Sequence, residues 1–497
     1  MHRRKTERIE EPAGECNQNL LPERSRCLWK PALNNLLLSR IVLIWLQFIS
    51  NALLPDFPTD AFKFSGVRQD EFHCFDRFFG WLFGGLARWD SVHFVNIALN
   101  GYIFENTLAF FPLFPTILRK LGAVFLVILP VHQHTSIILA GVLLNNACFF
   151  ATGMVLFSFV RIGHSEMVAF WATVLFAWNP ASIFFSSLYT ESVYTFATFA
   201  MLRILYGQAP LLLRLIGSTL LLTVSIGLRS NGLANAGYIA YFVAVNYVIV
   251  RFSTLLDQRS WKNAVRSAGR MVVVLGTLVF LTLLVALAVR RTGDAIADNF
   301  CNSTRLHSSD VKLFAKTNHY VLQGQDGNLP WCRSTDRRTT IFPTYYNHIQ
   351  KKYWNVEFFG YWKLRKLPCF LLAAPAIVSL LLIIADKFRY QPRFLSLLVF
   401  SDPFMPMIVH NIVMIGFGIT LFNVEILTRM LFSASPLLYI GFALIADRHL
   451  KVENQRFSEI RFSVWKKGGM LTTFIYLYFG FYFVCGTVLH VNWGPFT

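Results

Sequence analysis

The segment MVVVLGTLVFLTLLVALAV occupies residues 271–289 and contains no charged side chain. Arg290 and Arg291 follow it directly, so the apolar run ends at a sharp polar boundary. At about 1.5 Å of rise per residue, a helix of this length crosses the hydrocarbon core of a bilayer. A buried core helix could also be this apolar, but many similar runs occur along the chain. The segment therefore predicts a transmembrane helix, and its repetition predicts several.

The composition of the whole chain points the same way. Of 497 residues, 55% are hydrophobic and only 15% are charged, and the mean hydropathy is +0.47. An ordinary soluble domain has about 25% charged residues. A chain this apolar needs lipid around it, and we predict an all-α polytopic membrane protein.

The formal net charge of +19 would also suit a protein that binds nucleic acid. The basic residues, however, do not form one stripe. They lie in the joints between apolar runs, notably in 1–30, 251–270 and 447–467. Cytoplasmic joints of membrane proteins collect Lys and Arg in this way. The charge therefore indicates topology, and we expect no nucleic-acid partner.

The apolar runs predict a bundle of about eleven transmembrane helices. Residues 108–130 are also apolar, but prolines and basic residues interrupt them, so an interfacial or re-entrant position is expected. The predicted spans lie near 36–54, 135–160, 167–188, 192–206, 211–228, 232–250, 271–289, 368–385, 403–421, 426–446 and 470–490.

This topology divides the chain into three parts. Residues 1–35 form a basic cytosolic amino-terminal segment, and 36–490 form the transmembrane domain. Within that domain, 55–134 and 290–367 are expected to be luminal loop regions. Because the predicted number of spans is odd, 491–497 would form a luminal carboxyl end.

The second luminal loop offers a check on sidedness. Asn302 begins the sequence Asn-Ser-Thr, an acceptor for N-glycosylation, which occurs only in the lumen. Cys301 and Cys332 lie in the same loop, and an oxidising lumen permits a disulfide between them. Cys74 in the first loop is a rival partner.

The first luminal loop contains polar residues that a membrane anchor does not need. If ARWDSVHF (87–94) is helical, Asp90 and His93 lie on one face, next to Arg88. Glu105 follows in the same loop. An aromatic-rich helix with one acid could instead be an interfacial anchor, because Trp and Tyr favour the headgroup zone.

More ionisable residues meet the luminal face at the ends of later spans. Glu191 stands at a helix start, where it could simply be a capping residue favoured by the helix dipole. Arg229 lies in a turn between two spans. Glu425 and Arg429 are one helical turn apart and could pair with each other. Ionisable groups are costly at mid-membrane depth, so they usually lie at the edges or serve function.

The kinds of residue at this face suggest a chemistry. The sequence has no phosphate loop, zinc-binding helix or nucleophile elbow, and no Asp-x-Asp pair that could hold a metal beside a nucleotide sugar. Acids with arginines at a membrane face suit a lipid-phosphate sugar donor. One carboxylate can deprotonate a sugar hydroxyl, while Arg neutralises the departing phosphate. We expect neither a metal nor a cofactor.

Short motifs that recur in order over nearly the whole chain resemble the PIG-V family of GPI mannosyltransferases, in the multi-span GT-C class. Each motif alone is weak, but their order is specific. They are RWDSVHF (88–94), AFFPLFP (109–115), NPASIFF (179–185), LYTES (188–192), LRSNG (228–232), PWC (330–332), YWNV (353–356), LTR (427–429) and SASP (433–436).

The resemblance implies a GT-C-like bundle in the endoplasmic reticulum membrane that adds the second mannose to the GPI-anchor precursor. It further implies dolichol phosphate mannose as the donor and an α-1,6 linkage. Since the donor is β-linked, the configuration would invert, and a single displacement needs one base. The expected partners are the GPI precursor glycolipid, the lipid-linked donor and membrane lipids.

The resemblance also implies roles for single residues. Asp90 matches the essential acid that GT-C enzymes usually keep in the first luminal loop, with Glu105 and Glu191 as alternatives. The residues expected to bind substrate are Arg88, His93, Arg229 and Arg429.

Two other functions fit the same residues. One is another GT-C mannosyltransferase that acts on a different acceptor. The other is a lipid transporter without catalysis, although transporters often have internal repeats and mid-membrane charges, and neither is evident in this sequence.

Overall fold

The structure is a computed structural model that describes residues 28–64, 66–67, 71–245, 261–324, 329–333, 343–390, 404–453 and 470–496. Within these ranges, regular secondary structure is helical apart from one isolated β-bridge between Phe104 and Leu322. The predicted all-α class is confirmed. Most of the predicted cytosolic segment 1–35 and of the basic joint 447–467 lies outside the described residues.

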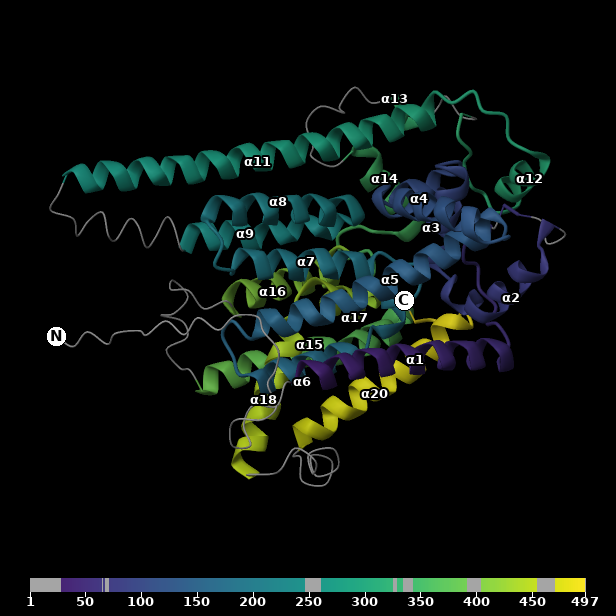
Figure 1. The fold of residues 1–497 in the computed structure, drawn as a ribbon. Coiled ribbons are helices and arrows are strands. Elements are labelled where there is room, and N and C mark those ends of the chain that lie inside the picture. Colours follow the sequence, from purple (N-terminus) through teal and green to yellow (C-terminus); the bar gives the residue numbers. More distant parts are fainter. Residues whose placement is uncertain are drawn as a thin grey trace.

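Most of the helices lie side by side in a bundle (Figure 1). The helices that come between α1 and α5, or between α11 and α15, in the sequence gather at one end of the bundle, which we call the loop end. The bundle contains α1 (Trp29–Leu53), α5 (Gln133–Val160), α6 (Glu166–Ala177), α7 (Glu191–Leu205), α8 (Leu211–Leu228), α9 (Ala236–Val243), α11 (Trp261–Cys301), α15 (Leu367–Tyr390), α16 (Phe404–Thr420), α17 (Leu427–Ala434), α18 (Leu437–Glu453) and α20 (Met470–Val491). The helices at the loop end are α2 (Cys74–Phe83), α3 (Asp90–Asn100), α4 (Leu113–Ile128), α12 (Ser309–Thr317), α13 (Pro330–Arg333) and α14 (Thr344–Trp354).

The helices support a multi-pass membrane protein but not the predicted number of spans. In the described part of the chain, six helices are long and apolar enough to cross a bilayer, namely α1, α5, α8, α11, α15 and α20. The bent pair α17–α18 makes a seventh if it is one span. Each of the predicted segments contains a helix, but the described parts of α6, α7, α9 and α16 are shorter than a full span. The count of about eleven is therefore not confirmed, because an apolar run can continue where its helix breaks.

The helices differ in how they are covered. α5 packs against α1, α4, α6 and α7, and half of its apolar stretch is buried by protein. By contrast, only 11% of the apolar stretch of α11 is buried, and α8 is its main neighbour in the bundle. The segment 271–289 lies in α11. An apolar helix this exposed fits a position with lipid on its open sides.

Two helix breaks bring polar residues into the apolar bundle. α6 ends at Ala177, just before Asn179-Pro180, and α7 begins at Glu191. Proline has no N–H group to continue the helix. The buried Arg40 of α1 holds this break, because its guanidinium donates to the Ala177 carbonyl (3.2 Å) and to the turn that follows. At the second break, a bend of 69° separates α17, which carries Arg429, from α18.

Helix α4 occupies the stretch for which an interfacial or re-entrant position was predicted. Its 16 residues are shorter than a full span, and it packs against α3 and α5. Its last residues are apolar yet exposed, with Val127 at 88% and Ile128 at 68%. This exposed apolar end is compatible with the predicted interfacial position.

A disulfide joins α11 to α13 at the loop end. It links Cys301 and Cys332, whose Cα atoms lie 5.9 Å apart. Cys74, the rival partner, is a free and exposed thiol in α2. The disulfide therefore ties the segment after α11 to the end of that helix.

Candidate active site

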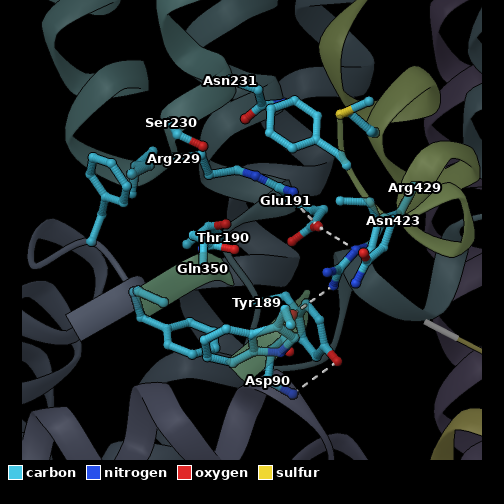
Figure 2. Close-up of a pocket in the computed structure, with 18 of the residues that line it drawn as sticks. Asp90, Tyr189, Thr190, Glu191, Arg229, Ser230, Asn231, Gln350, Asn423 and Arg429 are labelled. Atoms are coloured by element: carbon cyan, nitrogen blue, oxygen red, sulfur yellow. Dashed lines mark hydrogen bonds and ion pairs between the residues drawn. The ribbon is translucent and has the colours of Figure 1, made fainter. Parts of the chain in front are cut away.

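An open cavity of about 920 Å³ lies at the loop end (Figure 2). Helix ends supply most of its polar lining, because helices α3, α7 and α17 begin there and α8 ends there. Four of the predicted site residues thus meet in one place, although they are far apart in the sequence. The polar side chains that line the cavity are Asp90, Tyr189, Thr190, Glu191, Arg229, Ser230, Asn231, Tyr346, Gln350, Asn423 and Arg429.

Asp90 is the first residue of α3 and is held from two directions. Its backbone N–H donates to the hydroxyl of Tyr189 at 3.2 Å. Its carboxylate Oδ2 accepts a hydrogen bond from Nη1 of Arg429 at 2.9 Å. The Arg429 side chain is 9% exposed, whereas that of Asp90 is 30% exposed. The carboxylate is therefore fixed on one side and open to the cavity on the other.

Glu191 connects the two arginines of the cavity. It is the first residue of α7 and is only 1% exposed. Its carboxylate pairs with Arg229, and its Oε1 also lies 3.7 Å from Nε of Arg429. The four side chains thus alternate in charge in the order Arg229, Glu191, Arg429, Asp90 (Figure 2). Buried charges need such partners, and their formal charges cancel.

The ion pair determines the protonation state of Asp90. Burial alone would raise the pKa of its carboxyl group. The charge and hydrogen bond of Arg429, together with the charge of Arg229 and other neighbouring groups, outweigh burial, and the pKa lies below the ordinary value of 3.8. Asp90 is therefore ionised at neutral pH and can accept a proton.

His93 lies one helical turn after Asp90 but outside the cavity lining. Its ring is stacked between Phe62 and Phe110, with both centroid distances at 4.4 Å. Burial lowers the pKa of His93 to about 4, so the ring is neutral at neutral pH. These contacts suit a packing role for His93 better than the predicted role in binding substrate.

Glu105 is fully buried and also lies away from the cavity lining. Its Oε1 accepts from Nε1 of Trp331 at 2.9 Å. Its Oε2 accepts from the hydroxyl of Tyr353 at 2.8 Å and pairs with Lys352. These partners come from α13 and α14, so Glu105 connects the loop region before α5 to the loop region after α11. Both of its oxygens are engaged, which leaves it poorly placed as an alternative base.

Arg88 also turns away from the cavity. Its Nη2 donates to Oδ1 of Asn51 at 3.0 Å, and its Nη1 lies 3.4 Å from Asp56. The guanidinium stacks over the ring of Trp493 at 5.3 Å. These contacts favour a structural role over the predicted contact with substrate.

The alternative pairing of Arg429 with Glu425 is wrong. Glu425 accepts from the hydroxyl of Tyr361 at 2.6 Å and lies 3.9 Å from Lys366. It belongs to a 3₁₀ turn, Val424–Ile426, that precedes α17. The two residues therefore do not share the face of one continuous α-helix, as the spacing rule assumes.

Several lining residues were not singled out from the sequence as site residues. Tyr189 and Trp354 lie within motifs that carry the family resemblance, LYTES and YWNV, so a signal was present. Tyr346, Gln350 and Asn423 carried no such signal. Within the described ranges, no group of three or more His, Cys, Asp or Glu side chains could hold a metal ion.

Comparison with solved structures finds a likeness to the apo oligosaccharyltransferase of Archaeoglobus fulgidus. The TM-score is 0.41 at 12% sequence identity, and the match covers 94% of this chain. It spans 56% of the archaeal chain.

Comparison with known sequences finds relatives of higher identity. A GPI mannosyltransferase of Caenorhabditis elegans is 30% identical, over 83% of this chain and 72% of its own. The GPI mannosyltransferase 2 of Drosophila pseudoobscura pseudoobscura is also 30% identical, over 81% of this chain and 88% of its own. The GPI alpha-1,6-mannosyltransferase 2 of Homo sapiens is 28% identical, over 92% of this chain and 96% of its own. Residues 30–497 match the family described as Mannosyltransferase (PIG-V). The chain therefore belongs to the PIG-V family of mannosyltransferases.

Proposed function

We propose that this protein transfers the second mannose, through an α-1,6 linkage, to the GPI-anchor precursor. The donor is dolichol phosphate mannose, and the reaction takes place in the lumen of the endoplasmic reticulum. The observation that carries the proposal is the cavity in which the open carboxylate of Asp90 is paired with Arg429, with Arg229 in the same lining. The names of the relatives support the acceptor and the linkage.

The reaction is a single displacement. The carboxylate of Asp90 takes the proton from the 6-hydroxyl of the acceptor mannose as that oxygen attacks C1 of the donor mannose. The bond from C1 to the phosphate oxygen breaks at the same time, and the phosphate leaves with the bonding electrons. Attack from the opposite face inverts the configuration, so one base is sufficient and no covalent intermediate forms. The phosphate gains a negative charge, which a guanidinium can balance through charge-assisted hydrogen bonds.

Arg429 is placed to link donor binding to the strength of the base. Its guanidinium holds Oδ2 of Asp90 and lowers the pKa of that carboxyl group. A donor phosphate next to Arg429 would compete for the same positive charge. The pKa of Asp90 would then rise, so the carboxylate becomes a stronger base when the donor is bound.

An apolar groove beside the cavity supports a lipid-linked donor. The groove has a volume of about 1020 Å³ and lies between α4, α8 and α11. It shares the lining residues Phe110, Phe111 and Tyr346 with the cavity, so the groove and the cavity adjoin. The isoprenoid chain of the donor matches this apolar lining. Its phosphate would then lie at the cavity end, near Arg229 and Arg429.

We expect kcat/KM for mannose transfer to stay nearly constant between about pH 7.5 and about pH 5. This parameter reports the free enzyme, in which the pKa of Asp90 is below 3.8 and that of His93 is about 4. The ion pair of Asp90 with Arg429 also contributes to the free energy of unfolding. This contribution is fully present above the ordinary carboxyl pKa of 3.8, and it is lost only as pH falls through the lower pKa that Asp90 has in the folded protein. The measurement is the initial rate of purified enzyme across a buffer series. A rate step near pH 6.5 that disappears in His93→Phe would show instead that His93 titrates and takes part.

We further propose that the loop end faces the lumen and that the amino terminus is cytosolic. Asn302 is exposed and directly follows α11, so a glycosylation enzyme can reach it. Asn302→Gln is expected to abolish a glycosidase-sensitive shift in gel mobility. Asn318→Gln, an exposed asparagine of the same loop outside any sequon, should leave the shift intact. Cleavage of 290–367 by protease added to sealed microsomes would reverse this orientation.

The function itself is tested by following GPI intermediates with labelled mannose. Cells that lack the protein should accumulate an intermediate with one mannose, and the wild-type protein should remove it. A mannosyltransferase with another acceptor would leave GPI intermediates unchanged. A transporter would fail to form product when the purified protein is mixed with donor and acceptor in detergent.

A further inference from the structure

The segment that follows α20 is buried at the loop end. Helix α20 ends there (Figure 1), and Asn492, Trp493 and Phe496 are at most 4% exposed. The backbone N–H of Phe57 donates to the carbonyl of Asn492 at 2.8 Å. The segment is thus part of the folded core near the cavity, although none of its residues lines the cavity.

Trp493 packs against the two residues that immediately precede Asp90. Its ring centroid lies 5.5 Å from that of Trp89. The guanidinium of Arg88 lies over the same ring at 5.3 Å. The start of α3 therefore rests on Trp493.

The backbone at Trp89 shows why this support matters. Trp89 has φ 55° and ψ −125°, a positive-φ conformation that residues other than glycine rarely adopt. A conformation of this kind persists only where its surroundings impose it. The turn at Trp89 also sets the direction in which α3 begins, and hence the position of Asp90. Without support from Trp493, rotation at Trp89 would move the carboxylate relative to Arg429.

We propose that Trp493 is a positioning residue for Asp90. It holds Trp89 and Arg88 in place, and through them it fixes the carboxylate at the position from which it reaches the acceptor hydroxyl. The inference rests on the proposed role of Asp90 as the base. Trp493 itself touches no substrate.

The test compares steady-state kinetics of purified wild type, Trp493→Ala and Trp493→Phe, with dolichol phosphate mannose and the one-mannose GPI precursor. Trp493→Ala should lower kcat by about 10- to 100-fold, because a small misplacement of a reacting group is enough for such a loss. The KM for the donor should change by less than about threefold, since the cavity lining is intact. Trp493→Phe retains an aromatic face for Trp89 and should recover most of the rate. Trp81→Ala, which removes an indole from α2, is the matched control, and its kcat and KM should equal those of the wild type.

A double variant separates positioning from a general loss of structure. Asp90→Asn with Trp493→Ala should be no slower than Asp90→Asn alone, because a displaced base cannot matter once the base is gone. A normal kcat in Trp493→Ala, or a double variant in which the two losses multiply, would overturn the proposal. If the alanine variant does not accumulate, Trp493→Leu keeps apolar volume without an aromatic face and carries the same expectation. Absence of transfer by the wild type would count against the proposed function itself, so the two failures are distinguishable.

Discussion

Asp90→Asn is expected to reduce mannose transfer per molecule of protein by about 10²–10⁴-fold, the usual contribution of base catalysis. The amide has the size of the carboxylate and still offers an oxygen to Arg429, but it cannot take the proton from the acceptor hydroxyl. The hydrogen bond from the Asp90 N–H to Tyr189 involves the backbone and survives the substitution. Protein abundance and localisation should therefore remain close to normal. The measurement is transfer in membranes, normalised to the amount of enzyme.

The matched control is Asp310→Asn, which changes an exposed acid of α12 away from the cavity lining. It should transfer mannose at the wild-type rate. Near-normal turnover in Asp90→Asn would remove Asp90 as the base and leave Glu191, the other acid in the cavity. A parallel fall in abundance and activity would instead mark Asp90 as a structural residue. Glu105 is not a credible replacement, because its oxygens are used to hold α13 and α14.

Arg429→Ala is expected to reduce kcat by about 10²–10³-fold, a loss typical of removing one group that stabilises developing negative charge. Two effects act together. The departing phosphate loses a cation, and Asp90 loses the hydrogen bond that orients its carboxylate. Arg429→Lys should recover only part of the rate, since an ammonium group lacks the planar fork that can contact Asp90 and a phosphate at once. Initial rates at saturating donor, normalised to enzyme amount, measure the effect.

Arg365→Ala is the control for the loss of an arginine, because Arg365 is exposed and lies outside the cavity lining. Removing Arg429 also leaves Glu191 with a single cationic partner, Arg229. Abundance must therefore be measured beside activity. Full activity of Arg429→Ala at a normal protein level would refute any role for this residue in the reaction.

Local sequence patterns predicted the parts of the molecule that local physics controls. Long apolar runs require helices in lipid, so the membrane class followed from composition and the approximate positions of the bundle helices followed from the apolar runs. The polar motif around Asp90 and the acid at Glu191 were recognisable because both interrupt apolar sequence at a helix start. The disulfide between Cys301 and Cys332 was one of the pairings that an oxidising loop permitted.

Spacing along the sequence did not predict the contacts of side chains whose partners come from other helices. Glu425 and Arg429 have the spacing of a helical pair, yet Arg429 binds Asp90, which is 339 residues away. Asp90 and His93 lie within a turn of each other on α3, but one lines the cavity and the other is sealed in an aromatic stack.

The sequence by itself thus determined that this is a helical membrane protein, which acids and arginines stand at its helix ends, and which family its motifs resemble. Only the tertiary structure decided which of these groups share one cavity. It brought Asp90, Glu191, Arg229 and Arg429 together and assigned Glu105 to holding the loops. The physical reason is that helix formation and membrane insertion depend on neighbouring residues, whereas a buried charge takes its partner from whichever element the packed bundle places beside it.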